Sequence, residues 1–280
     1  MKLLNARKKL VTLAVASAIG GGVMVSAPAL ALNVSQNNIG EVLLFPYYTV
    51  KDNTNTSFSI VNTSDRTTIF KIRFREALNS RETRDFNVIL SPYDVWNGAV
   101  TANGDSALIR TFDKSCTSPL LTGMKTNAER AADGAKGEVG MTNALFAGSL
   151  ADGATEDISR VQEGYFEVIS MGVSPDEKDP IAVNAKHSSA GVPKDCVTVD
   201  KEFLAENIAD YQVGGVYEYD APINNLKGHV TYMNIAAGKA IDAEATHIEN
   251  FQDERNIIAE PGDVNPDLSD GNARMAVNLI

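Results

Sequence analysis

The sequence is poor in the side chains on which metal sites and nucleophilic catalysis most often depend. Its 280 residues include two cysteines and three histidines. His187, His229 and His247 have no second histidine or cysteine nearby at the spacing of a zinc ligand set. The sequence therefore gives little support for a zinc site.

The chain also lacks the short motifs that mark common enzyme classes. It has no P-loop, no G-x-G-x-x-G turn after an expected strand and no G-x-S-x-G elbow. We therefore expect a protein that is not an enzyme and that needs no organic cofactor. Because carboxylates are abundant, a hydrolase with two acidic groups about 5–10 Å apart in a cleft stays as a third hypothesis.

Positive charge is scarce as well. With 25 basic and 36 acidic residues, the formal net charge is −11. Loss of the first 31 residues, which contain four basic and no acidic side chains, would change it from −11 to −15. Such an acidic surface repels phosphate backbones and anionic lipids. We therefore expect neither nucleic-acid binding nor membrane association.

The amino terminus has the pattern of a secretory signal peptide. "MKLLNARKK" is basic, residues 10–25 are largely apolar, and "APALA" ends in small residues. Glycines interrupt the apolar run, which is also short for a membrane anchor. We expect cleavage after Ala31 and export of residues 32–280 to the periplasm, the cell surface or the medium.

Cys116 and Cys196 are the two cysteines. Exported proteins mature in oxidising compartments, so a disulfide between them is the expected state. A reactive or metal-binding pair is the alternative, but no histidine lies near either cysteine at a ligand spacing.

Alternation with a period of two dominates the middle of the chain, whereas helical periodicity is rare. In residues 67–76, Phe70, Ile72 and Phe74 share one face, and lysine and arginine share the other. Asn103-Gly104 between two apolar runs predicts a hairpin. Further strands are expected at residues 41–50, 57–62, 84–90, 164–173, 214–220 and 228–236.

The best helix candidate is residues 200–211, with Asp200 as a possible N-cap. Short strands separated by turn residues are typical of sandwiches. The expected fold is an all-β, immunoglobulin-like antiparallel β-sandwich with long loops and one or two short helices, occupying residues 32–280.

The most charged stretch is "IFKIRFREALNSRETRDFNVILSPYDVW", residues 69–96. It contains Ser91, Asp94 and the single tryptophan, Trp96, so a catalytic constellation has to be considered. Its charges alternate with apolar residues, however, and "LNSRE" is a natural turn. We expect two paired strands whose arginines meet Glu82 or Asp85 on a solvent-facing surface.

An acidic loop near the carboxyl end is a calcium candidate. "DVNPDLSDG" supplies the oxygen-bearing side chains of Asp263, Asn265, Asp267 and Asp270 in a short segment. The loop fails the EF-hand pattern, because Leu268 occupies the glycine position and Arg274 the glutamate position. A polar turn is the competing interpretation.

The sequence stops in the apolar run of "DGNARMAVNLI". Two interpretations are open: this strand docks onto a sheet or onto a neighbouring molecule, or the chain is cut short at residue 280.

Several segments together resemble a family of secreted proteobacterial proteins, usually described as hypothetical or cell-surface proteins. These segments are "IGEVLLFPYYTV", "FSIVNTSDRT", "KIRFREALNSRETRDFNVILSPYDVW", "DKSCT" and "EGYFEVISMGV", within residues 39–173. The resemblance implies an exported, β-rich surface protein and provides no catalytic residues. It also implies relatives that continue beyond a segment like the last one of this chain.

Two non-enzymatic functions follow from these features. The first is a structural or surface protein of the cell envelope or extracellular space that acts through surface contacts or through strand- or calcium-mediated self-association. The second is a polysaccharide-binding module that uses exposed rings. The candidate rings are Trp96, Tyr47, Tyr48, Tyr217 and Tyr219. In strands such rings more often pack in the core.

Overall fold

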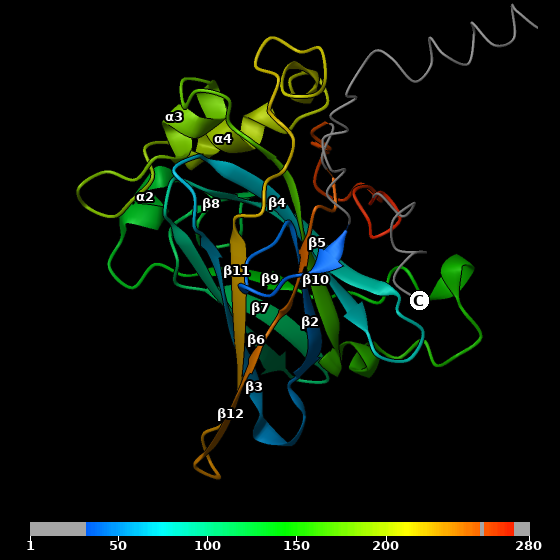
Figure 1. Ribbon diagram of the computed structural model, residues 1–280. Helices are drawn as coiled ribbons and strands as arrows, with labels where there is room; N and C mark the ends of the chain where they lie inside the picture. The colour runs from blue at the N-terminus through cyan, green and yellow to red at the C-terminus, as the bar shows by residue number, and fades with distance from the viewer. Residues whose placement is uncertain (1–31, 253–254, 272–280) are drawn as a thin grey trace, which may run out of the picture. The chain divides into compact units, whose positions relative to one another are not determined.

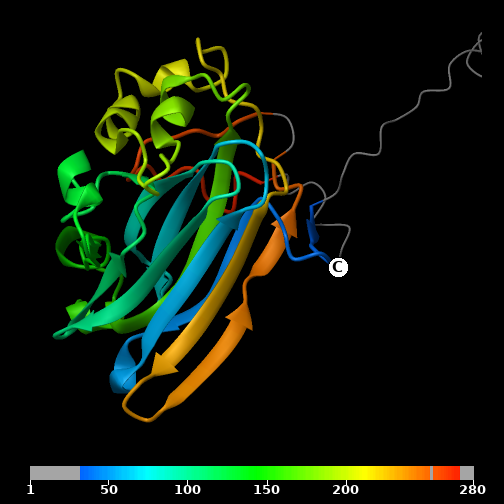
Figure 2. The ribbon, with the colours of Figure 1, turned by 90° about the vertical axis from the view of Figure 1, so that its left-hand side faces the viewer.

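The computed structural model describes residues 32–252 and 255–271, which belong to one unit of the chain, Ala31–Ile280. The predicted signal peptide and residues 272–280 of the apolar carboxyl-terminal run lie outside the described residues. Two antiparallel sheets pack against each other (Figures 1 and 2). The predicted all-β sandwich is therefore confirmed.

The first sheet has seven strands in the order β1-β13-β2-β10-β4-β5-β8. Their bounds are β1 Asn33–Val34, β13 Thr246–Glu249, β2 Val42–Thr49, β10 Glu163–Val173, β4 Thr68–Glu76, β5 Glu82–Leu90 and β8 Cys116–Ser118. Every pairing is antiparallel.

The second sheet has six strands in the order β12-β11-β3-β6-β7-β9. Their bounds are β12 Lys239–Glu244, β11 Leu226–Asn234, β3 Asn55–Asn62, β6 Val95–Asn103, β7 Ser106–Thr111 and β9 Gly137–Gly140. The predicted hairpin at Asn103-Gly104 joins β6 and β7.

Helices are short in the described part of the chain. The α-helices are α2 Asn127–Ala131, α3 Pro180–Ala185 and α4 Cys196–Glu202; the 3-10 turns are η1 Lys51–Asn53, η2 Gly148–Leu150, η3 Ile158–Gln162 and η4 Ile208–Asp210. No described helix has the length and apolar character needed to cross a bilayer.

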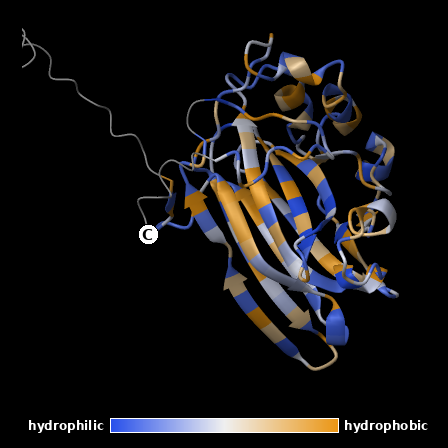
Figure 3. Ribbon diagram, turned by 90° about the vertical axis from the view of Figure 1, so that its right-hand side faces the viewer, coloured by the Kyte–Doolittle hydropathy of each residue, from blue (hydrophilic) through white to orange (hydrophobic). Residues whose placement is uncertain are grey.

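The outer faces of the two sheets differ in their burial. Along β3 and β7 buried and partly exposed residues alternate strictly, as expected for a sheet with one face in water. Figure 3 shows polar and apolar residues alternating along the strands. Along β4 and β10, by contrast, nearly every residue is buried. Both faces of the seven-stranded sheet are therefore covered at its centre.

The main core lies between the sheets and is rich in aromatic rings. Phe166 stacks on Phe45 with ring centroids 4.2 Å apart, and Phe58 lies 4.7 Å from Phe166. Phe58 also lies 5.6 Å from the Trp96 ring. This cluster joins the inner faces of β2, β10, β3 and β6.

A second apolar cluster covers one end of the seven-stranded sheet on its outer side. Ile69, Ile89 and Met171 contribute from the strands, and residues of α3, α4 and the turns that follow pack over them. The two helices lie together at this end of the sheets (Figure 1). We call residues 175–220 the helical cap.

The helical cap is joined covalently to the sheet, because Cys116 at the start of β8 forms a disulfide with Cys196 at the start of α4. The predicted disulfide is thus confirmed, and both cysteines are buried within the second cluster.

Two expectations for the cap were wrong. The predicted strand at residues 214–220 is a series of turns, because Gly214 has a positive φ of 85° and the Tyr217 N–H donates to the Asp210 carbonyl. The predicted helix at residues 200–211 is also wrong in its bounds: α4 begins at Cys196, where Asp195 rather than Asp200 accepts the capping hydrogen bonds, and ends at Glu202. Turns and the short η4 follow it.

Replacing both cysteines by alanine should lower the free energy of unfolding by about 2–4 kcal/mol, because the disulfide closes a long loop. Urea unfolding with and without a reducing agent measures this loss. Reductant should destabilise the wild type and leave the double variant unchanged; a wild type that is indifferent to reductant would contradict the assigned role.

His247 gives a second prediction. Burial lowers the pKa of its imidazole, since the charged ring would lose its solvation. The Glu244 carboxylate only partly opposes this shift, and the positive charge of Lys227 adds to it. Its Nε2 accepts a hydrogen bond of 3.0 Å from the Gly228 N–H, so the neutral ring links β13 to β11. The folded state therefore prefers neutral His247, whereas the unfolded chain takes up a proton near pH 6.5.

Stability from this group should be complete above pH 6.5 and decline as the pH falls through the lowered pKa of the folded state. Urea unfolding at pH 7.5 and pH 5 should show a larger loss for the wild type than for His247→Gln, which cannot titrate. Equal losses would contradict this linkage.

Candidate functional site

The charged stretch predicted to face solvent is buried. Lys71 and Arg73 alternate along β4 with core residues and so lie on the outer face of the seven-stranded sheet, yet each is only 1 % exposed. Glu167 on the neighbouring β10 is equally buried. The prediction of a solvent-facing ribbon is wrong, because a later part of the chain, residues 256–270, crosses this face. We call it the cover segment.

The cover segment binds Lys71 through backbone oxygens. The ammonium donates to the carbonyl oxygens of Glu260 at 3.1 Å, Asp263 at 2.7 Å and Asn265 at 2.8 Å. These carbonyls take the place of the water that would solvate an exposed ammonium. A buried amine is thereby supplied with acceptors for all three of its protons.

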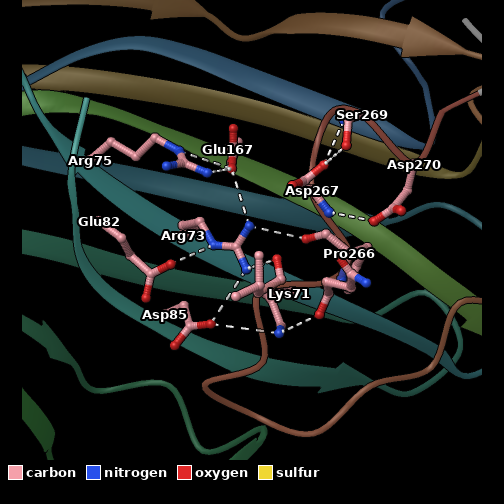
Figure 4. A network of polar contacts seen from close by, with 12 residues as sticks. Lys71, Arg73, Arg75, Glu82, Asp85, Glu167, Pro266, Asp267, Ser269 and Asp270 are labelled. Carbon is pink, nitrogen blue, oxygen red and sulfur yellow. Dashed lines mark hydrogen bonds and ion pairs between the residues drawn. The ribbon is translucent and has the colours of Figure 1, made fainter. Parts of the chain in front are cut away.

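Arg73 is held by the same turn. Its guanidinium donates to the carbonyl oxygens of Asp263 at 2.9 Å, Val264 at 2.8 Å and Pro266 at 3.1 Å (Figure 4). The loop therefore wraps its main-chain oxygens around two cationic side chains of β4.

Carboxylates from neighbouring strands balance these cations. Arg73 lies 3.0 Å from Glu82 and 3.7 Å from Asp85 of β5, as the predicted hairpin pairing requires. On the other side, Glu167 lies 3.7 Å from Arg73 and 3.1 Å from Arg75. Together with Lys71, which lies 3.6 Å from Asp85, three cations meet three anions. We call these six residues the charge cluster.

Desolvation acts on the pKa values in the charge cluster. Burial lowers the pKa of Lys71, although the Asp85 carboxylate partly opposes this effect. Burial also raises the pKa of Glu82, and the negative charge of Asp85 adds to the rise. Both shifts favour the neutral forms, so the charges persist because partners and backbone oxygens surround them.

A second buried ion pair fixes the β4–β5 turn. Arg160 lies 2.9 Å from Glu76 and 2.8 Å from Asp152. Burial alone would raise the pKa of Glu76, but hydrogen bonds from Arg160 and from backbone N–H groups of the turn outweigh it and lower the pKa. No spacing in the sequence signals this contact, because Arg160 and Glu76 are 84 residues apart.

A cleft of about 650 Å³ lies beside the charge cluster and includes Glu82 and Asp152 in its lining. Each of these carboxylates is engaged by an arginine, Glu82 by Arg73 and Asp152 by Arg160. A glycosidase pair needs one protonated acid and one available carboxylate. The contacts here use both acids as arginine partners, which favours an architectural role.

Ser91, Asp94 and His187 also come together, but not as a catalytic triad. Ser91 Oγ and Asp94 Oδ2 each lie 3.2 Å from the same ring nitrogen, Nδ1 of His187. In a triad the serine and the carboxylate contact opposite ring nitrogens. This arrangement instead ties the loop after α3 to the turn between β5 and β6.

The acidic loop proposed for calcium forms part of the cover segment. The carbonyl oxygens of Asp263 and Asn265 accept from Lys71, the Asp267 carboxylate accepts from Ser269, and the Asp270 carboxylate accepts from the Asp267 N–H. Across residues 32–252 and 255–271, no group of three histidine, cysteine or acidic residues is placed to hold a metal ion. The calcium assignment stays a prediction.

The candidate ligand-binding rings do not form a platform. Trp96, Tyr48 and Tyr219 are buried, so the packing interpretation holds for them. Tyr47 and Tyr217 are partly exposed. Tyr47 pairs with Tyr232 of β11, whereas Tyr217 packs in the helical cap, so the two do not share a surface.

The outer face of the six-stranded sheet carries a feature that the sequence interpretation missed. A groove of about 520 Å³ lies over β3, β6 and β7. Its lining residues are Asn55, Ser57, Asn97, Gly98, Ala99, Thr101, Arg110, Thr111, Phe112, Asp113 and Met233. The signal was present in the small polar residues at alternate positions of "NTSFSIVN" and "VWNGAVTA", but only strand register brings them together.

The charge cluster gives a prediction about stability. Lys71→Met should lower the free energy of unfolding by about 3 kcal/mol, since removing the ammonium leaves buried carbonyls and a buried carboxylate without their partner. Lys51→Met is a matched control, because Lys51 also pairs with a carboxylate, Glu163, but is 45 % exposed. It should cost less than about 1 kcal/mol. Similar losses for both variants in urea unfolding would contradict the burial of Lys71.

This chain matches no protein-family model, no curated protein and no solved structure. The resemblance to secreted proteobacterial surface proteins accordingly stays a prediction.

Proposed function

We propose that this chain is a non-enzymatic protein of the cell envelope or extracellular space that acts through surface contacts, with itself or with other envelope components. The observation that carries the proposal is the difference between the two outer sheet faces. One is sealed by the cover segment and the helical cap, and the other presents its polar residues to solvent.

The sealed face supports a structural role for the residues that looked most like a catalytic site. Lys71 and Arg73 are each engaged by ion pairs and by main-chain carbonyls. An active site needs groups that are free to touch a substrate. The outer face of the six-stranded sheet, which we call the open face, has in contrast a groove, an exposed ring at Phe112 and side chains with unused hydrogen-bonding groups.

Two further features agree with a protein that functions outside the cytoplasm. The buried Cys116–Cys196 disulfide is compatible with an oxidising compartment. The amino-terminal pattern of basic, apolar and small residues supports export. The strong negative charge favours partners other than nucleic acids and anionic lipids.

The test places a large charged side chain on the open face. Ser57 lies at the centre of this face, between Thr231 of β11 and Ala99 of β6. Ser57→Arg should weaken self-association or binding to envelope fragments at least tenfold, because the new side chain would fill the groove. Ser189→Arg, on an exposed turn of the helical cap, is the matched control.

Light scattering after size-exclusion chromatography, with calcium and then with EDTA, measures assembly of the chain from Leu32 onward. Sedimentation with envelope fragments measures contact with other components. A wild type that stays monomeric and does not sediment contradicts the proposal, as does a Ser57→Arg variant that behaves like the wild type.

A further inference from the structure

The groove on the six-stranded sheet is shaped by side-chain size. Across its middle, Thr231, Ser57, Ala99 and Arg110 are neighbours on four successive strands. The two central residues of this row are the smallest. Larger side chains of the lining are Met233 of β11 and Phe112, which directly follows β7. The sheet therefore forms a trough with a floor of short side chains.

The floor and walls carry hydrogen-bonding groups that the protein does not use. The side chains of Asn55, Ser57 and Asn97 make no hydrogen bond to any described residue. The Thr101 hydroxyl also has no partner among these residues, but its oxygen is buried beneath the groove. Two amides and one hydroxyl supply donors and acceptors within one groove. A ligand rich in hydroxyl groups matches such a mixture.

Phe112 adds an apolar surface to these polar groups. Its side chain is 64 % exposed and lines the groove directly after β7. The C–H groups on one face of a pyranose ring are apolar and can pack on an aromatic ring, while the hydroxyl groups at the edge reach polar side chains. An aromatic anchor with a few convergent polar groups is a common form of small-ligand site.

The charges around the groove favour a neutral ligand. Arg110 is paired with Glu138 at 2.7 Å, and Asp113 accepts hydrogen bonds from Ser115 and from the Asn97 N–H. Burial raises the pKa of Asp113, with the Asp94 charge adding to this rise. A polyanion would meet a chain of net charge −11 and a groove whose arginine is already neutralised.

We propose that this groove binds a neutral glycan chain, with Phe112 packing on a sugar ring and Asn55, Ser57 and Asn97 bonding its hydroxyl groups. The inference rests on the proposed function, since it names the partner of the same open face. It moves glycan recognition from the five rings suggested by the sequence to the groove over β3, β6 and β7.

Affinity electrophoresis tests the inference in native gels that contain one soluble polysaccharide each. The neutral probes are mixed-linkage β-glucan, dextran, mannan and galactan; alginate is the anionic probe, and a gel without polysaccharide is the reference. The wild type should be retarded by at least one neutral polymer and not by alginate. Phe112→Ala should raise the apparent dissociation constant at least tenfold, and Asn97→Ala should raise it severalfold.

Tyr93→Ala is the matched control, because Tyr93 is 70 % exposed but does not line the groove. Its positive φ of 58° is borne equally by tyrosine and alanine. It should bind like the wild type. Fluorescence of the buried Trp96 verifies that each variant is folded.

Retardation by none of the neutral polymers, retardation by alginate alone, or an equal effect of Phe112→Ala and Tyr93→Ala would overturn the inference. The two proposals fail separately. A chain that sediments with envelope fragments but is not retarded loses the glycan assignment and keeps the proposed function. A chain that neither assembles, sediments nor is retarded loses both.

Discussion

Burial of two cations on the outer face of the seven-stranded sheet is the constraint on which the rest of the structure depends. An ammonium and a guanidinium removed from water need acceptors on every side. Lys71 and Arg73 find them in the carboxylates of adjacent strands and in the carbonyl oxygens of the cover segment. Since those oxygens come from residues far along the chain, this contact fixes the course of residues 256–270.

The covered face determines where the protein can act. The cover segment and the helical cap together occupy the outer side of β4, β5 and β10, and the disulfide attaches the cap to β8. Within residues 32–252 and 255–271 the six-stranded sheet receives no such cover, and its alternating burial is the pattern of contact with solvent. The two faces differ in solvation: one carries charges that the chain itself shields, and the other presents polar side chains, including the Arg110–Glu138 pair, that water can solvate.

Sequence reasoning recovered the parts of the fold that side-chain alternation encodes. It predicted β2, β3, β4, β5, β10 and β11, the hairpin between β6 and β7, the disulfide and the meeting of Arg73 with Asp85. It failed where the partner is a main-chain carbonyl, because every residue type has one. In "DVNPDLSDG" the acidic side chains suggested a calcium loop, which stays a prediction, whereas the contact of its carbonyls with the Lys71 ammonium has no signal in the sequence. The groove escaped notice because it needs the register of strands distant in sequence, Asn55 beside Met233 and Ser57 beside Ala99.

The central claim is that contacts form on the open sheet and not at the charged face. Hydrogen–deuterium exchange, followed by mass spectrometry with and without envelope fragments, tests it most directly. The account predicts new protection in β3, β6 and β7, with residues 256–270 equally protected in both states. New protection confined to the turn between β4 and β5 and to the cleft around Asp152 would contradict it, and would return attention to the carboxylates there.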